Sequence, residues 1–241
     1  MVFKYIYGPI KSRRLGLSLG LSLSPGKTCN LNCIYCQWGR TSATVSGRRE
    51  YADPDEIIAE LKLWLRKNPK TAKELKFVTF SGLGEPTLNT QIGKLIRRVR
   101  SLTSRSIAVI TNSTLLGNPR VRKALMGADL VVPSLDAVDE KIFRRIDRPN
   151  PAIKLNKMIS GLISFGKEFR GKLWLEIMLV SGVNDGIGHI NKLKSVIRAV
   201  NPDKIQLNSP VRKTAEKDVL CVPRAKLEKI KKILGNKAEI I

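Results

Sequence analysis

Cys29-Asn-Leu-Asn-Cys33-Ile-Tyr-Cys36-Gln-Trp-Gly39 is the stretch that decides how this chain is interpreted. Spacers of three and two residues let one short loop place three thiolates around a single four-iron cluster. Three protein ligands for four irons leave one iron open to a substrate or cofactor. The alternative is a zinc site completed by His189 or Cys221. Structural zinc sites favour paired two-residue spacers, which neither residue provides.

The charge balance indicates an anionic partner. The 241 residues are 42% hydrophobic and 27% charged, values typical of a globular chain and not of a disordered, collagenous or disulfide-rich one. However, 44 Lys and Arg stand against 20 Asp and Glu, a net charge of +24. RNA or DNA is the usual partner of such a surface. A thermophile's Lys-rich surface is the alternative, although Glu normally rises with Lys there.

Part of this excess surrounds the cysteine loop. Residues 1–50 contain a single acid, Glu50. Their basic residues are Lys4, Lys11, Arg13, Arg14, Lys27, Arg40, Arg48 and Arg49. We therefore expect RNA to bind beside the cysteine loop, with Arg212 and Lys213 on the same rim.

Nothing in the sequence predicts a membrane segment. No stretch approaches the ~20 apolar residues that span a bilayer, and the first residues lack the apolar core and cleavage site of a signal peptide. We expect a cytoplasmic protein without a membrane partner. In that reducing compartment, clustered cysteines indicate metal binding and not a disulfide.

Short β-rich runs alternate with helical patterns. The predicted strands are 17–23, 77–81, 107–111, 130–135, 173–180 and 204–208. The predicted helices are 54–67, 91–102, 119–126, 140–146, 153–169, 187–200 and 224–234. Asp53-Pro54 and Asn118-Pro119 are typical helix starts. With no repeat or linker, the prediction is a single domain over 1–241, with a core over about 15–210 and a basic C-terminal helix over about 224–234.

Alternating strands and helices predict an α/β fold, a parallel sheet covered by outer helices. In such folds the ligand lies beyond the carboxyl ends of the strands. Glu176 cannot lie unpaired against a covering helix, so we expect its face of the strand to line a polar lumen. Ser134 and Asn208 lie at corresponding positions of other strands. One polar face per strand favours a barrel with a polar mouth.

Two motifs together resemble the radical S-adenosylmethionine (radical SAM) superfamily. The first is the C-x3-C-x2-C loop, with Tyr35 before its third cysteine. The second is Gly82-Leu-Gly-Glu-Pro86 at the end of the second predicted strand, which is similar to the GGEP motif of that superfamily but has Leu83 between its glycines. The resemblance covers almost the whole chain.

Further stretches resemble one branch of the superfamily. Tyr7-Gly-Pro-Ile-Lys-Ser-Arg-Arg-Leu-Gly16, with 80–88, 130–137 and 173–185, is similar to short archaeal and bacterial iron–sulfur oxidoreductases grouped with the wyosine tRNA-modifying synthases. The archaeal synthases carry further cysteines for a second cluster, whereas none precedes Cys29 here. This departure weighs against the wyosine reaction itself. Methylthiotransferases, and methyl-transferring relatives with two auxiliary cysteines, fit badly because only Cys221 is spare.

The resemblance implies a partial (β/α)6 barrel with a [4Fe–4S] cluster on Cys29, Cys33 and Cys36, and SAM at the mouth. The implied SAM contacts follow the motifs: Glu85 with the backbone of Gly82 and Gly84 for the amino group, Asn112, Ser134 and Asp136 for carboxylate and ribose, and Tyr35 and Met178 for adenine. The implied reaction is reductive cleavage of SAM to a 5′-deoxyadenosyl radical, which abstracts a substrate hydrogen. An electron donor such as ferredoxin or flavodoxin is implied as well.

Three functions remain open at this level. The first is RNA modification, with tRNA as the substrate, favoured by the charge and the branch. The second is an activase that installs a glycyl radical on a partner enzyme, favoured by the short chain with one cluster. The third is a metal-binding RNA protein without catalysis. No catalytic residue is assigned; Glu176, Asn208 and Arg212 are expected to face the substrate.

Several residues have a plain structural interpretation. Cys221 is expected to be a buried thiol, and His189 a surface or capping residue. Trp38 is expected to pack over the cluster. Arg13 and Arg14 suit a phosphate site and a solvated turn equally well.

Overall fold

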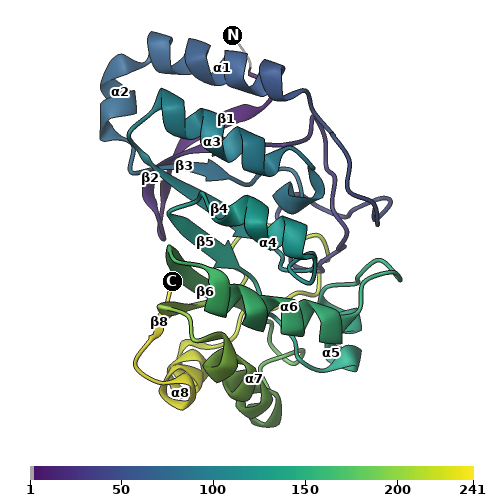
Figure 1. Cartoon of the computed structure of the whole chain (residues 1–241). Coiled ribbons are helices and arrows are strands. Elements are labelled where there is room, and N and C mark those ends of the chain that lie inside the picture. The colour runs from purple at the N-terminus through teal and green to yellow at the C-terminus, as the bar shows by residue number, and fades with distance from the viewer. Residues whose placement is uncertain (1–2) are drawn as a thin grey trace.

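The computed structural model describes residues 3–241 and places one open sheet at the centre of the molecule (Figure 1). Its strands lie in chain order: β1 (Ile6–Ser12), β2 (Gly16–Leu21), β3 (Phe77–Phe80), β4 (Ser106–Thr111), β5 (Leu130–Pro133), β6 (Lys172–Met178), β7 (Lys204–Asn208) and β8 (Ala238–Ile240). β1 pairs antiparallel with β2, and every later neighbour pairs parallel. The predicted α/β class is confirmed. The sheet is not closed, because β1 and β8 are its two edges.

Helices cover one face of this sheet. They are α1 (Pro54–Lys67), α2 (Pro69–Glu74), α3 (Ile92–Leu102), α4 (Pro119–Leu125), α5 (Glu140–Ile146), α6 (Leu155–Glu168), α7 (Ile187–Val200) and α8 (Arg224–Leu234), with a 3-10 turn η1 (Pro86–Leu88). α1, α3, α4, α6 and α7 follow one another along the outside of the sheet (Figure 1). None of the helices within 3–241 is long and apolar enough to cross a membrane.

The helix starts follow the predicted capping chemistry. The Asp53 side chain accepts a hydrogen bond from the backbone N–H of Asp55 at 2.8 Å, and Asn118 does the same for Arg120 at 2.9 Å. In each case proline follows the cap and begins the helix, where its missing N–H costs nothing. These caps fix where α1 and α4 begin, and thus how they lie on the sheet.

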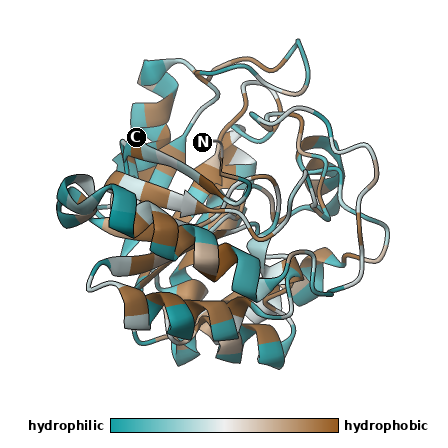
Figure 2. Cartoon of the chain, turned by 90° about the horizontal axis from the view of Figure 1, so that it is seen from above, coloured by the Kyte–Doolittle hydropathy of each residue, from teal (hydrophilic) through white to brown (hydrophobic). Residues whose placement is uncertain are grey.

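The two faces of the sheet carry different side chains. Leu19, Leu21 and Phe80 are fully buried in the main core, between the sheet and the helices. In the hydropathy view the strands and inner helix surfaces are largely hydrophobic, and the outer helix surfaces hydrophilic (Figure 2). A second, smaller cluster lies on the opposite face and includes Leu15 and Val132. The alternation predicted from the strand sequences therefore holds, and the concave face is free to line a lumen.

The structure also corrects the prediction. Six strands were predicted, and β1, α2 and β8 were missed. β1 contains Gly8 and Pro9, which disfavour a strand interior but are tolerated in an edge strand. β8 is only three residues long. The predicted strand ends at 22–23, 134–135 and 179–180 lie in loops instead, beyond the last ladder pairs.

Candidate functional site

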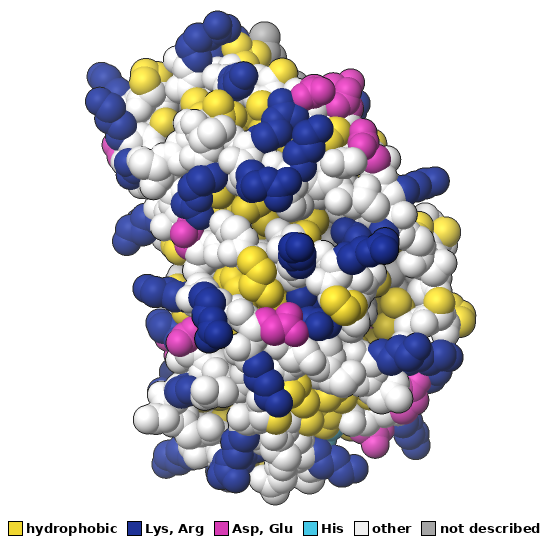
Figure 3. Space-filling model, viewed as in Figure 1, with side chains coloured by type: hydrophobic (Ala, Val, Ile, Leu, Met, Phe, Trp, Pro, Cys, Tyr) yellow, Lys and Arg dark blue, Asp and Glu magenta, His cyan; other side chains and the backbone are white. Residues whose placement is uncertain are grey.

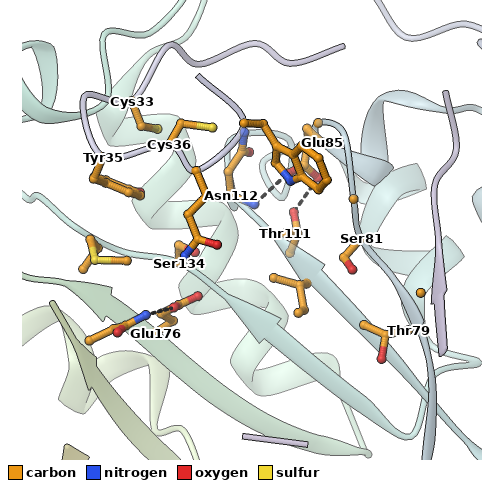
Figure 4. A pocket seen from close by; sticks show the side chains of 18 of the residues that line it. Cys33, Tyr35, Cys36, Thr79, Ser81, Glu85, Thr111, Asn112, Ser134 and Glu176 are labelled. Carbon is orange, nitrogen blue, oxygen red and sulfur yellow. Dashed lines mark hydrogen bonds between the residues drawn. The ribbon is translucent and has the colours of Figure 1, made fainter. Parts of the chain in front are cut away.

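A cavity of about 430 Å³ opens at the carboxyl ends of the parallel strands. Cys29, Cys33 and Cys36 line it together with polar side chains from the concave face of the sheet (Figure 4). The lining residues from strands are Tyr7, Ile10 and Ser12 from β1, Ser18 and Gly20 from β2, Thr79 from β3, Ile110 and Thr111 from β4, Glu176 and Met178 from β6 and Asn208 from β7. The polar lumen predicted from strand parity is therefore present.

The cysteine loop brings three thiols to one wall of this cavity. Lys27 Nζ lies 3.3 Å from Cys36 Sγ, Asn112 Nδ2 lies 3.6 Å from Cys29 Sγ, and Cys33 Sγ lies 3.3 Å from Asp147 Oδ1. Burial raises the pKa of Cys29 to about 12, so its thiol is uncharged unless a metal replaces the proton.

The donor set fits a multi-iron cluster. Within residues 3–241, no three His, Cys, Asp or Glu side chains are close enough to share a single metal ion. Neither His189 nor Cys221, the ligands considered for zinc, lines the cavity. Three thiols spaced along one loop suit the separate corners of a cubane.

The turn after β3 ties the cysteine loop to the sheet. Gly84 has a φ of +155°, and an added Cβ would lie 1.8 Å from the carbonyl oxygen of Thr28. Only glycine fits there. Thr28 N–H donates to Leu83 O at 2.8 Å, and Glu85 N–H donates to Thr28 O at 2.9 Å. The two motifs of the sequence are thus joined directly by backbone hydrogen bonds.

Glu85 lines the cavity, but protein donors already surround its carboxylate. Oε1 accepts from Thr87 N–H at 3.0 Å, Thr87 Oγ1 at 2.6 Å and Thr111 Oγ1 at 2.7 Å, and Oε2 accepts from Asn112 N–H at 2.6 Å. Burial raises the pKa of Glu85, and these hydrogen bonds oppose that rise. Glu85 therefore fixes the backbone between η1 and the end of β4.

The structure places Asp136 behind the cavity wall. Of the residues expected to contact SAM, all but Asp136 line the cavity: Tyr35, Gly82, Gly84, Glu85, Asn112, Ser134 and Met178. One oxygen of its buried carboxylate accepts from Tyr35 Oη, and the other from Met178 N–H at 2.8 Å. Asp136 thus supports the two residues expected beside adenine. Its predicted direct contact with SAM is not evident in this geometry.

The three expected substrate-facing residues all line the cavity. Glu176 Oε2 lies 2.7 Å from Arg14 Nη1, and its Oε1 accepts from Asn208 Nδ2 at 3.1 Å. Arg212 Nη1 donates to Gln37 Oε1 at 3.3 Å. Sequence reasoning left Arg14 open between a phosphate site and a solvated turn. It missed the pairing with Glu176, because Arg14 lies in the turn between β1 and β2 and β1 was not predicted.

Two further expectations were wrong, those for His189 and Cys221. His189 is buried, with 7% of its surface exposed, and its Nε2 lies 3.4 Å from the Asp136 carbonyl oxygen. Cys221 is exposed and donates to Pro210 O, in the irregular segment between β7 and α8. For both residues, long-range placement outweighs the local pattern. Trp38 is 56% exposed and lines the cavity together with the three cysteines, so its expected packing over the cluster stays a prediction.

The basic residues on the face seen in Figure 3 are not confined to one patch. Lys and Arg are spread over nearly the whole of that face, with few acids between them. Near the site, Arg48 donates to the carbonyl oxygens of Thr87 at 2.8 Å and Asn89 at 3.3 Å. Arg48 is therefore a structural residue, contrary to its expected place among the RNA contacts.

Comparison with known proteins agrees with this site. The family model described as the radical SAM superfamily matches residues 23–192. The chain is 37% identical over 235 residues to the UPF0026 protein MJ1312 of Methanocaldococcus jannaschii, covering 98% of this chain and 71% of that protein. The chain therefore belongs to the radical SAM superfamily and, within it, to the UPF0026 proteins. It is a radical SAM enzyme, and the family does not specify which reaction it catalyses.

Other relatives are longer than this chain. It is 40% identical to a Brachyspira hyodysenteriae protein named GTPase Obg, over 95% of this chain but 33% of that protein. It is 27% identical to the dual-specificity RNA methyltransferase RlmN of Nitratidesulfovibrio vulgaris, over 89% of this chain and 59% of that protein. A structure of TYW1 with a lysine–pyruvate adduct bound has a TM-score of 0.66 at 23% identity, over 90% of this chain and 72% of that one. The last match shows a shared fold.

Proposed function

We propose that this protein binds a [4Fe–4S] cluster and SAM in the cavity, cleaves SAM reductively and abstracts a hydrogen atom from a substrate carried on RNA. The observation that supports this most is the convergence of Cys29, Cys33 and Cys36 with the glycine turn and Glu85 on one cavity. When bound, the cluster and SAM supply the one-electron chemistry.

Different residues of the cavity would bind the cluster and the two ends of SAM. The three cysteines would hold the cluster, and Lys27 would place a positive charge beside Cys36. The glycine turn and Asn112 would bind the methionine end of SAM, and Tyr35 and Met178 would flank its adenine. Asp136 would act indirectly, because its carboxylate holds both of those residues.

Cofactor release tests the chemistry. Anaerobically reconstituted, reduced protein should release 5′-deoxyadenosine from SAM slowly, even without substrate. Asp136→Asn should weaken SAM binding through Tyr35 and Met178 while leaving the iron content unchanged. Absence of 5′-deoxyadenosine from a protein with a full cluster would contradict the proposal.

Two observations support RNA as the substrate: the net positive charge of the chain and the small volume of the cavity. The net charge of +24 favours a polyanion, and the RlmN relative is named as an RNA methyltransferase. A cavity of about 430 Å³ holds about one cofactor-sized molecule. A large substrate would therefore lie across the rim and insert only its reacting group.

The salt dependence of tRNA binding tests this assignment. If about five phosphates are contacted, log affinity should fall with log salt at a slope of roughly −3.5 to −4.5. The variant to use replaces exposed basic residues near the rim: Arg13, Arg49, Arg212 and Lys213 to Ala. A matched control replaces four basic residues of α8 that do not line the cavity: Arg224, Lys229, Lys231 and Lys232.

The rim variant should bind tRNA more weakly and with a shallower slope than the control. Equal losses in both variants would indicate a general charge effect. Undetectable tRNA binding would instead favour the glycyl-radical activase, which needs a protein partner and no polyanion affinity.

A further inference from the structure

The turn between β1 and β2 packs against the concave face of the open sheet and lines the cavity. Leu15 is 4% exposed and packs with Ala108, Leu130 and Val132 in the second hydrophobic cluster, on the concave face of the sheet. This packing anchors the turn. It also directs the two residues before Leu15, Arg13 and Arg14, to the cavity lining.

Arg14 is held in place but has unused donors. Its Nη1 lies 2.7 Å from Glu176 Oε2 and is buried, yet the angle does not make a hydrogen bond. Within residues 3–241 the guanidinium forms no hydrogen bond at all, although it carries five N–H donors. Nη1 faces Glu176, whereas the Nε and Nη2 donors of this partly exposed side chain have no hydrogen-bond partner among the described residues and are available to an acceptor that enters the cavity.

The surrounding charges favour an anion. Arg13 has no side-chain partner among the described residues, and the guanidinium of Arg212 makes one long hydrogen bond, to Gln37. Both acids of the lining are already occupied: Glu85 by four donors, and Glu176 by Arg14 and Asn208. Unpaired positive charge therefore remains in the cavity lining.

The Arg14–Glu176 pair lies across the cavity from the cysteines, whereas Arg212 reaches the residue after Cys36, Gln37. In the close-up, Cys33 and Cys36 lie on one side of the cavity, and Glu176 lies across it on the strands (Figure 4). Of the residues expected to hold SAM, Glu85 and Asn112 lie at the glycine turn, whereas Ser134 and Met178 lie beside Glu176. The Arg14–Glu176 pair therefore lies at the border between the expected SAM site and the rest of the cavity.

We propose that Arg14 binds an oxyanion group of the substrate, a phosphate or a carboxylate, while Arg13 and Arg212 add positive charge to the same cavity lining. This inference rests on the proposed function, because it assigns the substrate end of the same cavity. The planar guanidinium forms two parallel hydrogen bonds to such groups. Glu176 neutralises Arg14 in the empty cavity, and Asn208 keeps Glu176 in place when the anion binds.

Calorimetric titration under anaerobic conditions tests this site in the reconstituted protein, with SAM saturating so that its own subsite is filled. The probes are inorganic phosphate, AMP and acetate, with adenosine as the uncharged control. AMP or phosphate binding tighter than acetate assigns the site to a phosphate, and the reverse order to a carboxylate. Adenosine should not bind detectably.

Variants then locate the binding. Arg14→Gln should weaken the preferred probe about 10- to 100-fold, as expected for lost charge-assisted hydrogen bonds. Glu176→Gln should strengthen it, because the competing carboxylate is gone. Arg14→Lys keeps the ion pair and the fold but loses the planar fork, and should give an intermediate loss. The matched pair is Arg224→Gln and Glu228→Gln, an exposed ion pair on α8 that should change nothing.

Three outcomes would overturn the inference: no probe binds the wild type, Arg14→Lys and Arg14→Gln bind like the wild type, or SAM competes with the anion. The last would assign the arginines to the cofactor. Substrate-free release of 5′-deoxyadenosine is measured separately. A protein that binds the anion but never cleaves SAM would refute the proposed function and leave the anion site standing.

Discussion

The cysteine end of the cavity and its arginine end are built on opposite principles. At the cysteine end, the acids are saturated by the protein: Glu85 accepts four hydrogen bonds, and Asp136 accepts from Tyr35 and Met178. At the arginine end, Arg14 has an ion pair without a hydrogen bond, and Arg13 has no side-chain partner among the described residues. One end is pre-organised by internal contacts, and the other keeps donors free.

This difference separates fixed chemistry from variable recognition. Residues that hold a cofactor must be rigid, so their polar groups form hydrogen bonds with one another and with the backbone. A substrate site needs polar groups that remain available until the ligand arrives. Polar satisfaction within the protein therefore distinguishes the two ends more clearly than residue type does.

The largest effect is expected at the cysteines. Cys33→Ala should lower the iron content from about four per chain to near zero, because two ligands cannot retain a cubane that needs three. Cys29→Ala and Cys36→Ala should behave alike. Cys221→Ala is the matched control, since this thiol is exposed and lies outside the cavity lining. A full cluster in Cys33→Ala, or its loss in Cys221→Ala, would contradict the assignment.

Removing the Glu85 carboxylate should destabilise the fold itself. Glu85→Ala leaves the backbone N–H groups of Thr87 and Asn112 without their acceptor, which should cost about 3 kcal/mol. Urea unfolding of cluster-free protein measures this cost in the absence of any ligand. Glu168→Ala, which breaks the partly exposed ion pair with Arg122, is the control and should cost less than about 1 kcal/mol. Equal stability of the two variants would mean that Glu85 serves only a ligand.

The sequence predicted the cysteine end better than the arginine end, for a physical reason. Cys29 to Cys36 and Gly82 to Pro86 are local motifs, and their spacing alone constrains the backbone. Arg14 meets Glu176 through a turn and a strand far apart in the chain, and β1 contains glycine and proline. His189 shows the same limit: its position on a polar helix start suggests exposure, but α7 packs it against the carbonyl of Asp136.

His189 allows a pH test of the packing behind the cysteine end. Burial lowers its pKa below the ordinary 6.5, so the unfolded chain takes up this proton first as the pH falls. Wild-type stability should therefore decline relative to His189→Gln from about pH 7.5 down through 6.5. Because the chain has a single histidine, the difference between the two unfolding free energies isolates this residue. A difference that stays constant with pH would place His189 in contact with water.

The smallest expected changes in stability and tRNA affinity distinguish Arg48 from Arg49, two adjacent arginines near the cysteine end. Arg48 donates to the carbonyl oxygens of Thr87 and Asn89, so Arg48→Gln should cost about 1 kcal/mol of stability and leave tRNA affinity nearly unchanged. Arg49 is exposed, with its guanidinium 4.7 Å from the centre of the Tyr51 ring. Arg49→Gln should cost about 0.5 kcal/mol or less but lower tRNA affinity at low salt. Both variants lose one charge, so urea unfolding and tRNA titration in parallel separate the two roles. If both variants weaken tRNA binding equally, then Arg48 contacts RNA despite its hydrogen bonds to the backbone. That result would contradict the distinction between donors already bonded within the protein and donors that remain available.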